Sequence, residues 1–181
     1  MKKTDIVILV SQKYVKEPYV DDIALKYLLE KKGCKTEIVA WDDLDYDFSL
    51  THIALIRSCW DYDQRICEFI KKMKLIAQQT RLINPIDMIL QNTNKLYLKK
   101  LKTVGVEIVP TVFISNLKEI EPTLQTIEWD EVIIKPVISA SGRNTYKIKK
   151  QDNGLCYGST AKTQKLNPLH PLRGHPPQGG N

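Results

Sequence analysis

The chain has 181 residues, 43% hydrophobic and 27% charged, which is enough apolar material for a buried core and a soluble globular fold. Its formal net charge is +6, and the acidic and basic residues are interspersed along the sequence without a basic block. This distribution disfavours nucleic-acid binding. The first hydrophobic run, residues 6–10, is too short for a signal peptide or a membrane span, and the four cysteines form no CxxC pair. We therefore expect a reduced, cytoplasmic protein without membrane contact, zinc site or disulfide framework.

Strand and helix patterns alternate in the first half of the chain. Continuous aliphatic runs at residues 6–10 and 52–56 are typical of strands buried on both faces of a parallel sheet. Asp21 and Asp22 are expected to cap a helix that ends at Gly33. The other predicted elements are a strand at 35–41, a helix at 64–79 and a short strand at 81–84. This alternation predicts a doubly wound α/β layer with right-handed crossovers.

The pattern changes after Pro85, where a domain boundary is expected and an α+β segment begins. Helices are predicted at 94–104 and 117–127, and strands at 106–114, 131–137 and 145–149. The final 31 residues hold five of the eight glycines and four of the nine prolines, with almost no periodic apolar pattern. We therefore divide the chain into domains at 1–88 and 89–150 and a disordered tail at 151–181.

The loop after the third predicted strand carries several polar side chains. Arg57, Ser58, Trp60 and Asp61 stand where a parallel strand meets its loop, which is where ligands bind in doubly wound folds. The guanidinium of Arg57 could bind a substrate carboxylate with two hydrogen bonds. The alternative is a structural ion pair between Arg57 and Asp61 or Asp63.

Two lysines of the second segment are candidates for binding phosphate. Lys95 stands at the start of a predicted helix, where the helix dipole favours an anion, although it could instead belong to a solvated lysine face with Lys99, Lys100 and Lys102. Lys135 shares a strand face with Ile133 and Val137, so its charge needs an anionic partner unless the side chain extends to water. The small residues Ser139, Ala140, Ser141 and Gly142 follow, and their backbone N–H groups could approach a phosphate. Such residues are equally common in ordinary hairpin turns.

The order of these motifs resembles the ATP-grasp family, in particular its glutathione-synthetase-like branch, which includes the enzyme that closes cycloserine. The resemblance covers residues 5–149 and is most specific at 57–62, at Lys95, at 110–111 and at 135–136. It implies a parallel-sheet pre-ATP-grasp domain at 1–88 followed by the first α+β subdomain of an ATP-grasp fold at 89–150. Members of the family phosphorylate a carboxylate to an acyl phosphate, which an amine or similar nucleophile then attacks, and two magnesium ions neutralise the phosphates.

The resemblance also implies roles for individual residues. Lys95 and Lys135 would contact the phosphates of ATP, and the loop formed by Ser139, Ala140, Ser141 and Gly142 would cover them. Arg57 would act as a catalytic and substrate-binding residue, and Ser58, Trp60 and Asp61 would also face the small carboxylate substrate.

The sequence departs from the family in two ways. The adenine hinge and the magnesium ligands belong to the second half of the grasp fold, and Asp152 is the only acidic residue after Lys150. We therefore expect no metal ligand in these 181 residues and an incomplete, inactive portion of a ligase. Cys59 stands where the nearest relatives would have threonine, so the acceptor substrate is not assigned. The alternative function is a non-catalytic α/β binding or dimerisation module. A homodimer is considered as a partner arrangement in either case.

Overall fold

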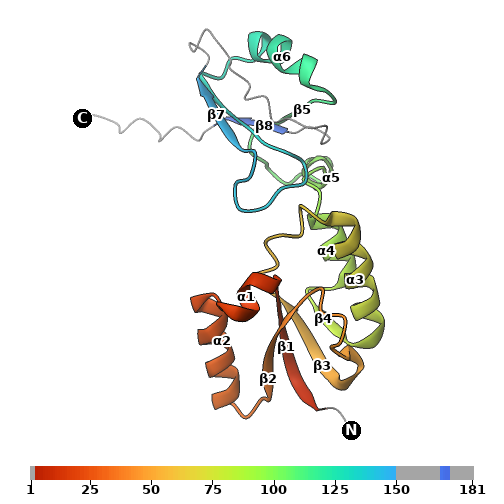
Figure 1. The fold of residues 1–181 in the computed structure, drawn as a ribbon. Helices are drawn as coiled ribbons and strands as arrows, with labels where there is room; N and C mark the ends of the chain where they lie inside the picture. Colours follow the sequence, from red (N-terminus) through yellow and green to blue (C-terminus); the bar gives the residue numbers. More distant parts are fainter. Residues whose placement is uncertain (1–2, 150–167, 172–181) are drawn as a thin grey trace, which may run out of the picture. The chain divides into compact units, whose positions relative to one another are not determined.

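The structure is a computed structural model that describes residues 3–149 and 168–171. The chain divides into two compact units, Met1–Thr93 (unit 1) and Asn94–Asn181 (unit 2). Unit 1 contains a parallel sheet with helices, and unit 2 contains an antiparallel sheet with helices (Figure 1). The predicted fold class, an α/β layer followed by an α+β unit, is therefore confirmed.

Four parallel strands form the sheet of unit 1 in the order β2-β1-β3-β4. They are β1 (Thr4–Val10), β2 (Thr36–Ala40), β3 (Thr51–Ile56) and β4 (Arg81–Ile83). The aliphatic run in β1 is fully buried from Val7 to Val10, as expected for the centre of a parallel sheet.

The helices of unit 1 are α1 (Gln12–Lys16), α2 (Val20–Lys31), the 3-10 helix η1 (Phe48–Leu50), α3 (Ile66–Gln79) and α4 (Ile86–Asn92). α2 ends as predicted: Gly33 adopts a φ of +85°, and the Cys34 N–H donates to the Leu29 carbonyl over 3.1 Å. The expected capping by Asp21 and Asp22 is wrong. Tyr19 occupies the N-cap position without a side-chain bond, because the helix begins one residue earlier and turns Asp22 inward.

The core of unit 1 lies between the sheet and α3. Phe69, Met73 and Ile76 repeat at helical spacing on α3 and are at most 3% exposed. They pack against the alternate side chains Val7 and Leu9 of β1, and Ile86 and Ile89 of α4 extend the same cluster.

Unit 2 contains a four-stranded antiparallel sheet in the order β5-β8-β6-β7. Its strands are β5 (Val112–Phe113), β6 (Glu131–Ile134), β7 (Tyr146–Lys149) and β8 (Pro168–Pro171), and its helices are α5 (Tyr97–Thr103), η2 (Leu117–Glu119) and α6 (Ile120–Thr126). Val132 and Ile134 of β6 pack against Ile120 of α6 in a small separate core. Pro122 is tolerated because it lies in the first turn of α6, where an N–H has no partner within the helix.

Two elements of unit 2 differ from expectation. The strand predicted at 106–114 is reduced to Val112–Phe113, since only these two residues find a partner strand and Val106 is 46% exposed. The tail predicted to be disordered lies outside the described residues except at Pro168–Pro171, whose backbone pairs with β5 and β6. Composition could not indicate this strand, because the segment has no apolar alternation and two prolines.

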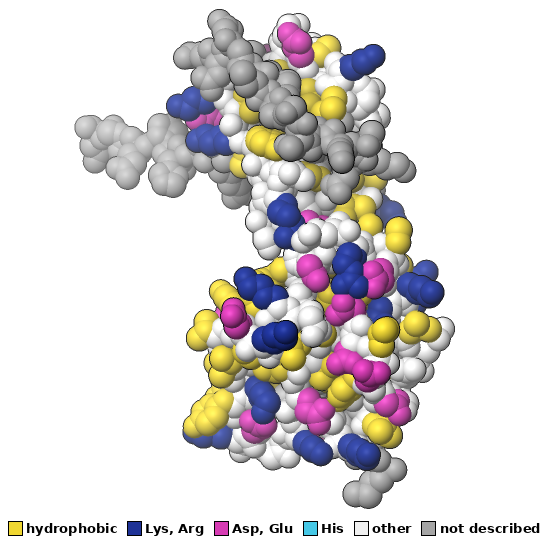
Figure 2. Space-filling model, in the orientation of Figure 1, with side chains coloured by type: hydrophobic (Ala, Val, Ile, Leu, Met, Phe, Trp, Pro, Cys, Tyr) yellow, Lys and Arg dark blue, Asp and Glu magenta, His cyan; other side chains and the backbone are white. Residues whose placement is uncertain are grey.

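Acidic and basic side chains are interspersed over the face of the molecule that Figure 2 shows. None of the helices in the described part of the chain has the length and apolar character needed to cross a bilayer.

Candidate functional site

Lys95 and the loop after β6 are brought together in unit 2, although some 40 residues separate them in sequence. The Lys95 N–H donates to the Val137 carbonyl over 2.8 Å. Its Nζ donates to the carbonyl and hydroxyl oxygens of Ser139 over 3.0 and 2.9 Å. Lys95 lies in the turn before α5 and not inside a helix, because α5 begins two residues later at Tyr97. The ammonium group is therefore held at the loop by side-chain and backbone contacts, and no helix dipole is involved.

Lys135 follows directly after β6 and is half-buried. Burial lowers the pKa of its ammonium group, because removing the charge from water disfavours the protonated form. No carboxylate or other hydrogen-bond acceptor of residues 3–149 contacts this ammonium. A half-buried cation without a partner is the arrangement expected at a site for an anionic ligand.

The loop next to Lys135 has an unusual backbone. Ser141 and Gly142 adopt consecutive left-handed conformations, with φ values of 51° and 71°. A Cβ at Gly142 would meet no atom within 4 Å, so the backbone angle and not crowding favours glycine there. The N–H groups of Ser141 and Gly142 have no acceptor in the described part of the chain. Two free amides next to a half-buried lysine can bind phosphate oxygens.

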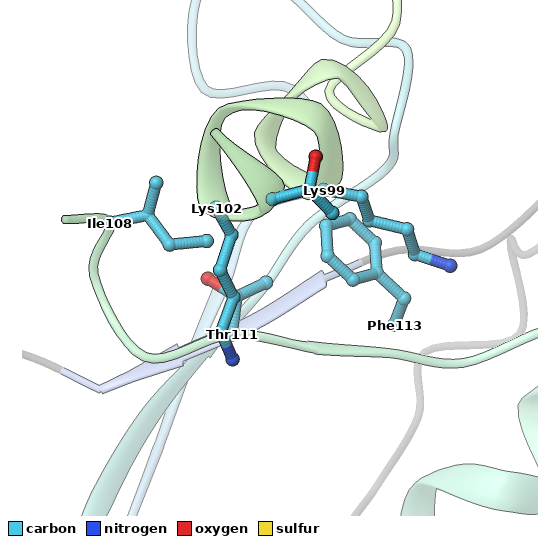
Figure 3. Close-up of a pocket in the computed structure, with 6 residues that line it drawn as sticks. Lys99, Lys102, Ile108, Thr111 and Phe113 are labelled. Carbon is cyan, nitrogen blue, oxygen red and sulfur yellow. The ribbon is translucent and has the colours of Figure 1, made fainter. Parts of the chain in front are cut away.

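A separate shallow pocket of about 370 Å³ lies between α5 and residues 108–113 (Figure 3). Its lining consists of Lys99, Lys102, Thr103, Ile108, Thr111 and Phe113. The Nζ of Lys99 lies 4.8 Å from the centre of the Phe113 ring, a distance suited to a cation–π contact. None of the predicted phosphate-binding residues lines this pocket.

In unit 1, Arg57 is held by a buried aspartate. The Arg57 Nε donates to Asp22 Oδ1 over 3.0 Å, and the buried Ser58 hydroxyl donates to Asp22 Oδ2. The side chain of Asp22 is fully buried, whereas that of Arg57 is 40% exposed. Because Nε faces the aspartate and no described residue accepts from the two Nη groups, these groups can bind a carboxylate in a bidentate manner. The sequence suggested Asp61 or Asp63 as the ion-pair partner of Arg57. In the structure, the partner of the Arg57 Nε is Asp22.

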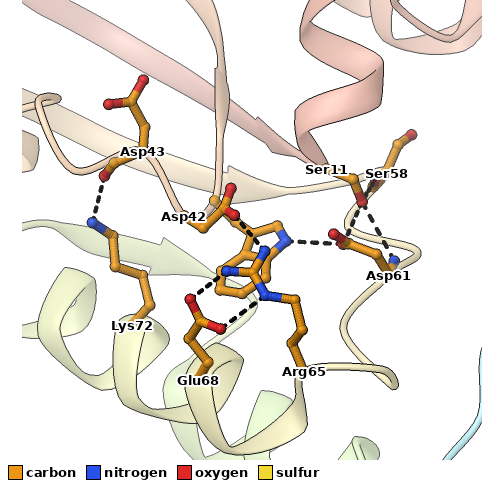
Figure 4. A network of polar contacts seen from close by, with 9 residues as sticks. Ser11, Asp42, Asp43, Ser58, Asp61, Arg65, Glu68 and Lys72 are labelled. Carbon is orange, nitrogen blue, oxygen red and sulfur yellow. Dashed lines mark hydrogen bonds and ion pairs between the residues drawn. The ribbon is translucent and has the colours of Figure 1, made fainter.

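Asp61 takes part in a different network (Figure 4). Its Oδ1 accepts hydrogen bonds from Trp41 Nε1 over 2.9 Å and from the Ser11 hydroxyl over 2.5 Å. Ser11 and Ser58 are also joined, because the Ser11 N–H donates to the Ser58 carbonyl over 2.9 Å. These bonds connect the ends of β1, β2 and β3. Asp61 therefore fixes the loop that follows Arg57.

Trp60 belongs to an aromatic group at the same edge of the sheet. Its ring packs edge-on against Tyr14 and Tyr19, with centroid distances of 5.2 and 5.0 Å, and it is 36% exposed. Cys59 points the other way into the core, where burial raises the pKa of its thiol. Its Sγ donates to the Leu9 carbonyl, so this cysteine has a structural environment.

A charged cluster lies over the ring of Trp41, whose Nε1 donates to Asp61. Arg65 binds Glu68 through two nitrogens and Asp42 through Nη1, and its guanidinium stacks over the Trp41 ring at 4.8 Å. Glu68 and then Asp42 raise the pKa of Arg65, while Arg65 lowers the pKa of the exposed Glu68. Asp42 Oδ1 is buried and accepts no hydrogen bond from the described residues. The cluster fixes the loop after β2 to the start of α3.

The structure thus joins the predicted residues into two separate groups, one in each unit. Sequence reasoning missed Asp22, Ser11 and Trp41 as partners of the loop after β3. The pair Asp21-Asp22 is the signal in the sequence, but aspartates at a helix start are typical caps and do not by themselves indicate a buried ion pair. No cluster of three or more His, Cys, Asp or Glu side chains within the described ranges has the arrangement of a metal site.

Comparisons with known proteins agree with this arrangement. Residues 6–84 match a family model described as the N-terminal domain of the D-cycloserine synthetase DcsG. The cycloserine biosynthesis protein DcsG of Streptomyces lavendulae is 30% identical over 83 residues, which are 46% of this chain and 28% of that protein.

Solved structures extend the similarity to most of the chain at the level of fold. The crystal structure of the D-cycloserine synthetase DcsG has a TM-score of 0.71 at 24% identity, covering 80% of this chain and 50% of that chain. A RimK domain ATP-grasp protein from Sphaerobacter thermophilus has a TM-score of 0.69 at 14% identity, covering 92% and 64%. This chain therefore spans between about half and two thirds of the length of these two structures. The resemblance expected from sequence is confirmed: residues 6–84 are similar to the N-terminal domain of DcsG, and the fold of the chain is similar to the folds of solved ATP-grasp proteins.

Proposed function

We propose that this chain is the ATP-binding portion of an ATP-grasp ligase that activates a carboxylate as an acyl phosphate. In that reaction a carboxylate oxygen attacks the γ-phosphorus of ATP and ADP leaves, after which an amine attacks the acyl carbon and phosphate leaves. The observation that supports the proposal best is the half-buried Lys135, which has no acceptor in the described part of the chain. The similarity to DcsG and to other ATP-grasp proteins supports the ligase class.

The residues around Lys135 fit a polyphosphate. Lys135 would neutralise charge on the phosphates, and the free N–H groups of Ser141 and Gly142 would donate to their oxygens. Lys95 holds the loop through Ser139 and can turn its ammonium group toward a phosphate when the loop moves. Ala140 has no polar side chain and would contribute only a backbone that permits close approach.

We propose Arg57 as the residue that binds and orients the small carboxylate substrate. Asp22 fixes the direction of the guanidinium, which leaves both Nη groups for the two oxygens of the substrate. Ser58 would act indirectly by sharing Asp22, and Asp61 would act indirectly by fixing the loop. Trp60 offers a partly exposed apolar ring on the same loop, which would accept the carbon skeleton of the substrate.

Magnesium is the second cofactor that the family resemblance implies. Magnesium prefers carboxylate oxygens together with phosphate oxygens, and the described residues contain no group of three or more His, Cys, Asp or Glu side chains that could hold a metal ion. We therefore propose no magnesium ligand in this chain and expect the isolated 181 residues to bind nucleotide without turning it over. A cytoplasmic location is part of the proposal.

Thermal unfolding with and without Mg-ATP separates this proposal from a non-catalytic binding or dimerisation module. A ligand with a dissociation constant of about 1 mM, present at about 10 mM, stabilises the native state by about 1.4 kcal/mol. We expect an upward shift of the melting temperature by a few degrees, and a smaller shift with adenosine, which lacks the phosphates. A melting temperature that does not move with Mg-ATP would favour the non-catalytic module.

A further inference from the structure

The pocket between α5 and residues 108–113 combines an apolar floor with a rim of lysines. Ile108 and Phe113 contribute half-buried side chains to the floor, whereas Lys99 and Lys102 of α5 are exposed at its edge. In Figure 3, Ile108 lies on one side of the pocket, and the Phe113 ring lies on the other side with Lys99. The volume of about 370 Å³ falls within the range of about 300–1,000 Å³ that is usual for small-molecule sites.

The turn after α5 builds the two walls of this pocket. The Gly105 N–H donates to the Lys102 carbonyl over 3.1 Å, and the next N–H, that of Val106, donates to the Leu101 carbonyl over 3.0 Å. This pair of bonds is the Schellman arrangement that ends many helices. After the turn, residues 108–113 lie along the lysine-bearing side of α5 and continue into β5, which pairs with β8. Backbone hydrogen bonds therefore fix both walls.

The two lysines at the rim carry charges without a counterion. No acidic side chain of residues 3–149 forms an ion pair with Lys99 or Lys102. The two residues stand three positions apart on α5, so they share a face of the helix and their charges repel each other. The Lys99 Nζ lies 4.8 Å from the centre of the Phe113 ring, so the ammonium group is held beside the apolar floor. An anion between the two lysines would offset the repulsion and gain charge-assisted contacts.

The hydroxyl groups of the lining restrict the ligand further. Thr103 Oγ1 donates to the Lys100 carbonyl over 2.8 Å. Thr111 Oγ1 donates to the Val109 carbonyl over 2.6 Å. A hydroxyl has one proton to donate, so both protons are used within the turns of the protein, and the ammonium groups are the remaining side-chain donors of the lining. A carboxylate, which only accepts hydrogen bonds, matches these donors.

We infer that this pocket binds a small aromatic carboxylate. The ring lies against Phe113 and Ile108, and the carboxylate oxygens accept from Lys99 and Lys102. Aromatic rings pair edge-on or offset at centroid distances of about 4.5–7 Å, and such a pair is more favourable than its buried area alone. The Lys99 ammonium group, already near one ring, then contacts a second. An aliphatic carboxylate of the same size buries a similar apolar area but makes neither of these ring contacts.

Titration of the 181-residue chain with benzoate, followed by its backbone amide signals in NMR spectra, tests the inference. We expect saturable shifts at α5 and residues 108–113 with a dissociation constant of about 1 mM. Benzamide has the same ring without the charge and should bind about tenfold more weakly, because it loses the ion pairs with both lysines. Cyclohexanecarboxylate has the charge without the aromatic ring and should bind about threefold more weakly.

Three variants assign the contacts to individual side chains. Lys99→Met keeps the length of the side chain and should weaken benzoate binding about fivefold, because one exposed ion pair is lost. The matched control is Lys100→Met, which changes the neighbouring exposed lysine outside the lining and should bind benzoate like the unchanged chain. Phe113→Leu keeps an apolar floor without the ring, so it should bind benzoate and cyclohexanecarboxylate equally well.

Several results would overturn the inference. They are shifts that do not saturate at about 20 times the expected dissociation constant, benzamide binding as tight as that of benzoate, and equal effects of Lys99→Met and Lys100→Met. Shifts confined to residues 139–142 would place the anion at Lys135 and would equally overturn it. None of these results bears on the nucleotide proposal, because neither Lys135 nor that loop lines the pocket. Both lysine variants replace exposed side chains, so their circular dichroism should be that of the unchanged chain.

Discussion

Asp22 is the group on which the geometry of the Arg57 site depends, so its replacement provides the sharpest test of that site. Asp22→Ala removes the acceptor of Ser58, whose residue is 1% exposed, and the acceptor of Arg57 Nε. A buried hydroxyl group left without a partner costs about 1–3 kcal/mol. The ion pair with Arg57 adds at most about 1 kcal/mol, because the 40% exposed arginine can be solvated again. We expect unit 1 to lose about 1–4 kcal/mol of stability.

Two related variants make this test specific. Asp22→Asn keeps the size of the side chain and one acceptor, so its effect should be smaller than that of Asp22→Ala. Asp21→Ala changes an exposed neighbour on the same helix, and it should cost less than about 0.5 kcal/mol. Native-state hydrogen exchange of the β1 and β3 amides reports on unit 1 alone and measures all three variants. Equal effects of Asp22→Ala and Asp21→Ala would refute the assignment of Asp22 as the buried anchor of Arg57.

Three further predictions concern reactivity, pH and folding. Among the three cysteines of the described residues, iodoacetamide should modify the exposed Cys67 first, the half-buried Cys34 more slowly and Cys59 last, because burial raises the pKa of the Cys59 thiol. Mass spectrometry of the native chain that found Cys59 modified before the other two would contradict this. Lys135→Met should stabilise the chain at pH 7, and the gain should shrink toward pH 10 in urea titrations. Burial lowers the pKa of Lys135, so the charged lysine destabilises the folded state at every pH below that pKa, and this destabilisation is lost as the pH rises through it. A stabilisation by Lys135→Met that grew with pH would be inconsistent with a desolvated lysine. A fragment of residues 1–93 should unfold cooperatively in circular dichroism, because its core cluster is contained within it, and a fragment without secondary structure would show that unit 1 depends on the rest of the chain.

The parallel layer of unit 1 was predictable because its signals are local. The aliphatic runs of β1 and β3 and the periodic Phe69, Met73 and Ile76 of α3 are read within a few residues of sequence, and each became the expected element. The pairing of β6 with β7 across the loop at 139–142 was predictable for the same reason.

What could not be predicted depends on partners distant in sequence. β8 forms because its backbone fits between β5 and β6, a long-range pairing that its composition does not reveal. The same holds for Asp22, whose partners Arg57 and Ser58 lie some 35 residues later. At a helix start an aspartate is usually a cap, and only a one-residue shift of the helix turned it into the buried partner of a guanidinium. The contact of Lys95 with Ser139 is a further long-range case.

The central claim, that Lys135 and its loop bind the phosphates of a nucleotide, is tested most directly by isothermal titration of the 181-residue chain with Mg-ATP. We predict saturable binding with a dissociation constant of about 1 mM, equivalent to about 4 kcal/mol. Lys135→Ala should abolish this binding, because it removes the half-buried cation without an acceptor in the described residues. Lys99→Ala, which changes an exposed lysine of the same unit, should leave it unchanged. Equal affinity of the Lys135→Ala variant and the unchanged chain, or binding lost with Lys99→Ala instead, would contradict the account.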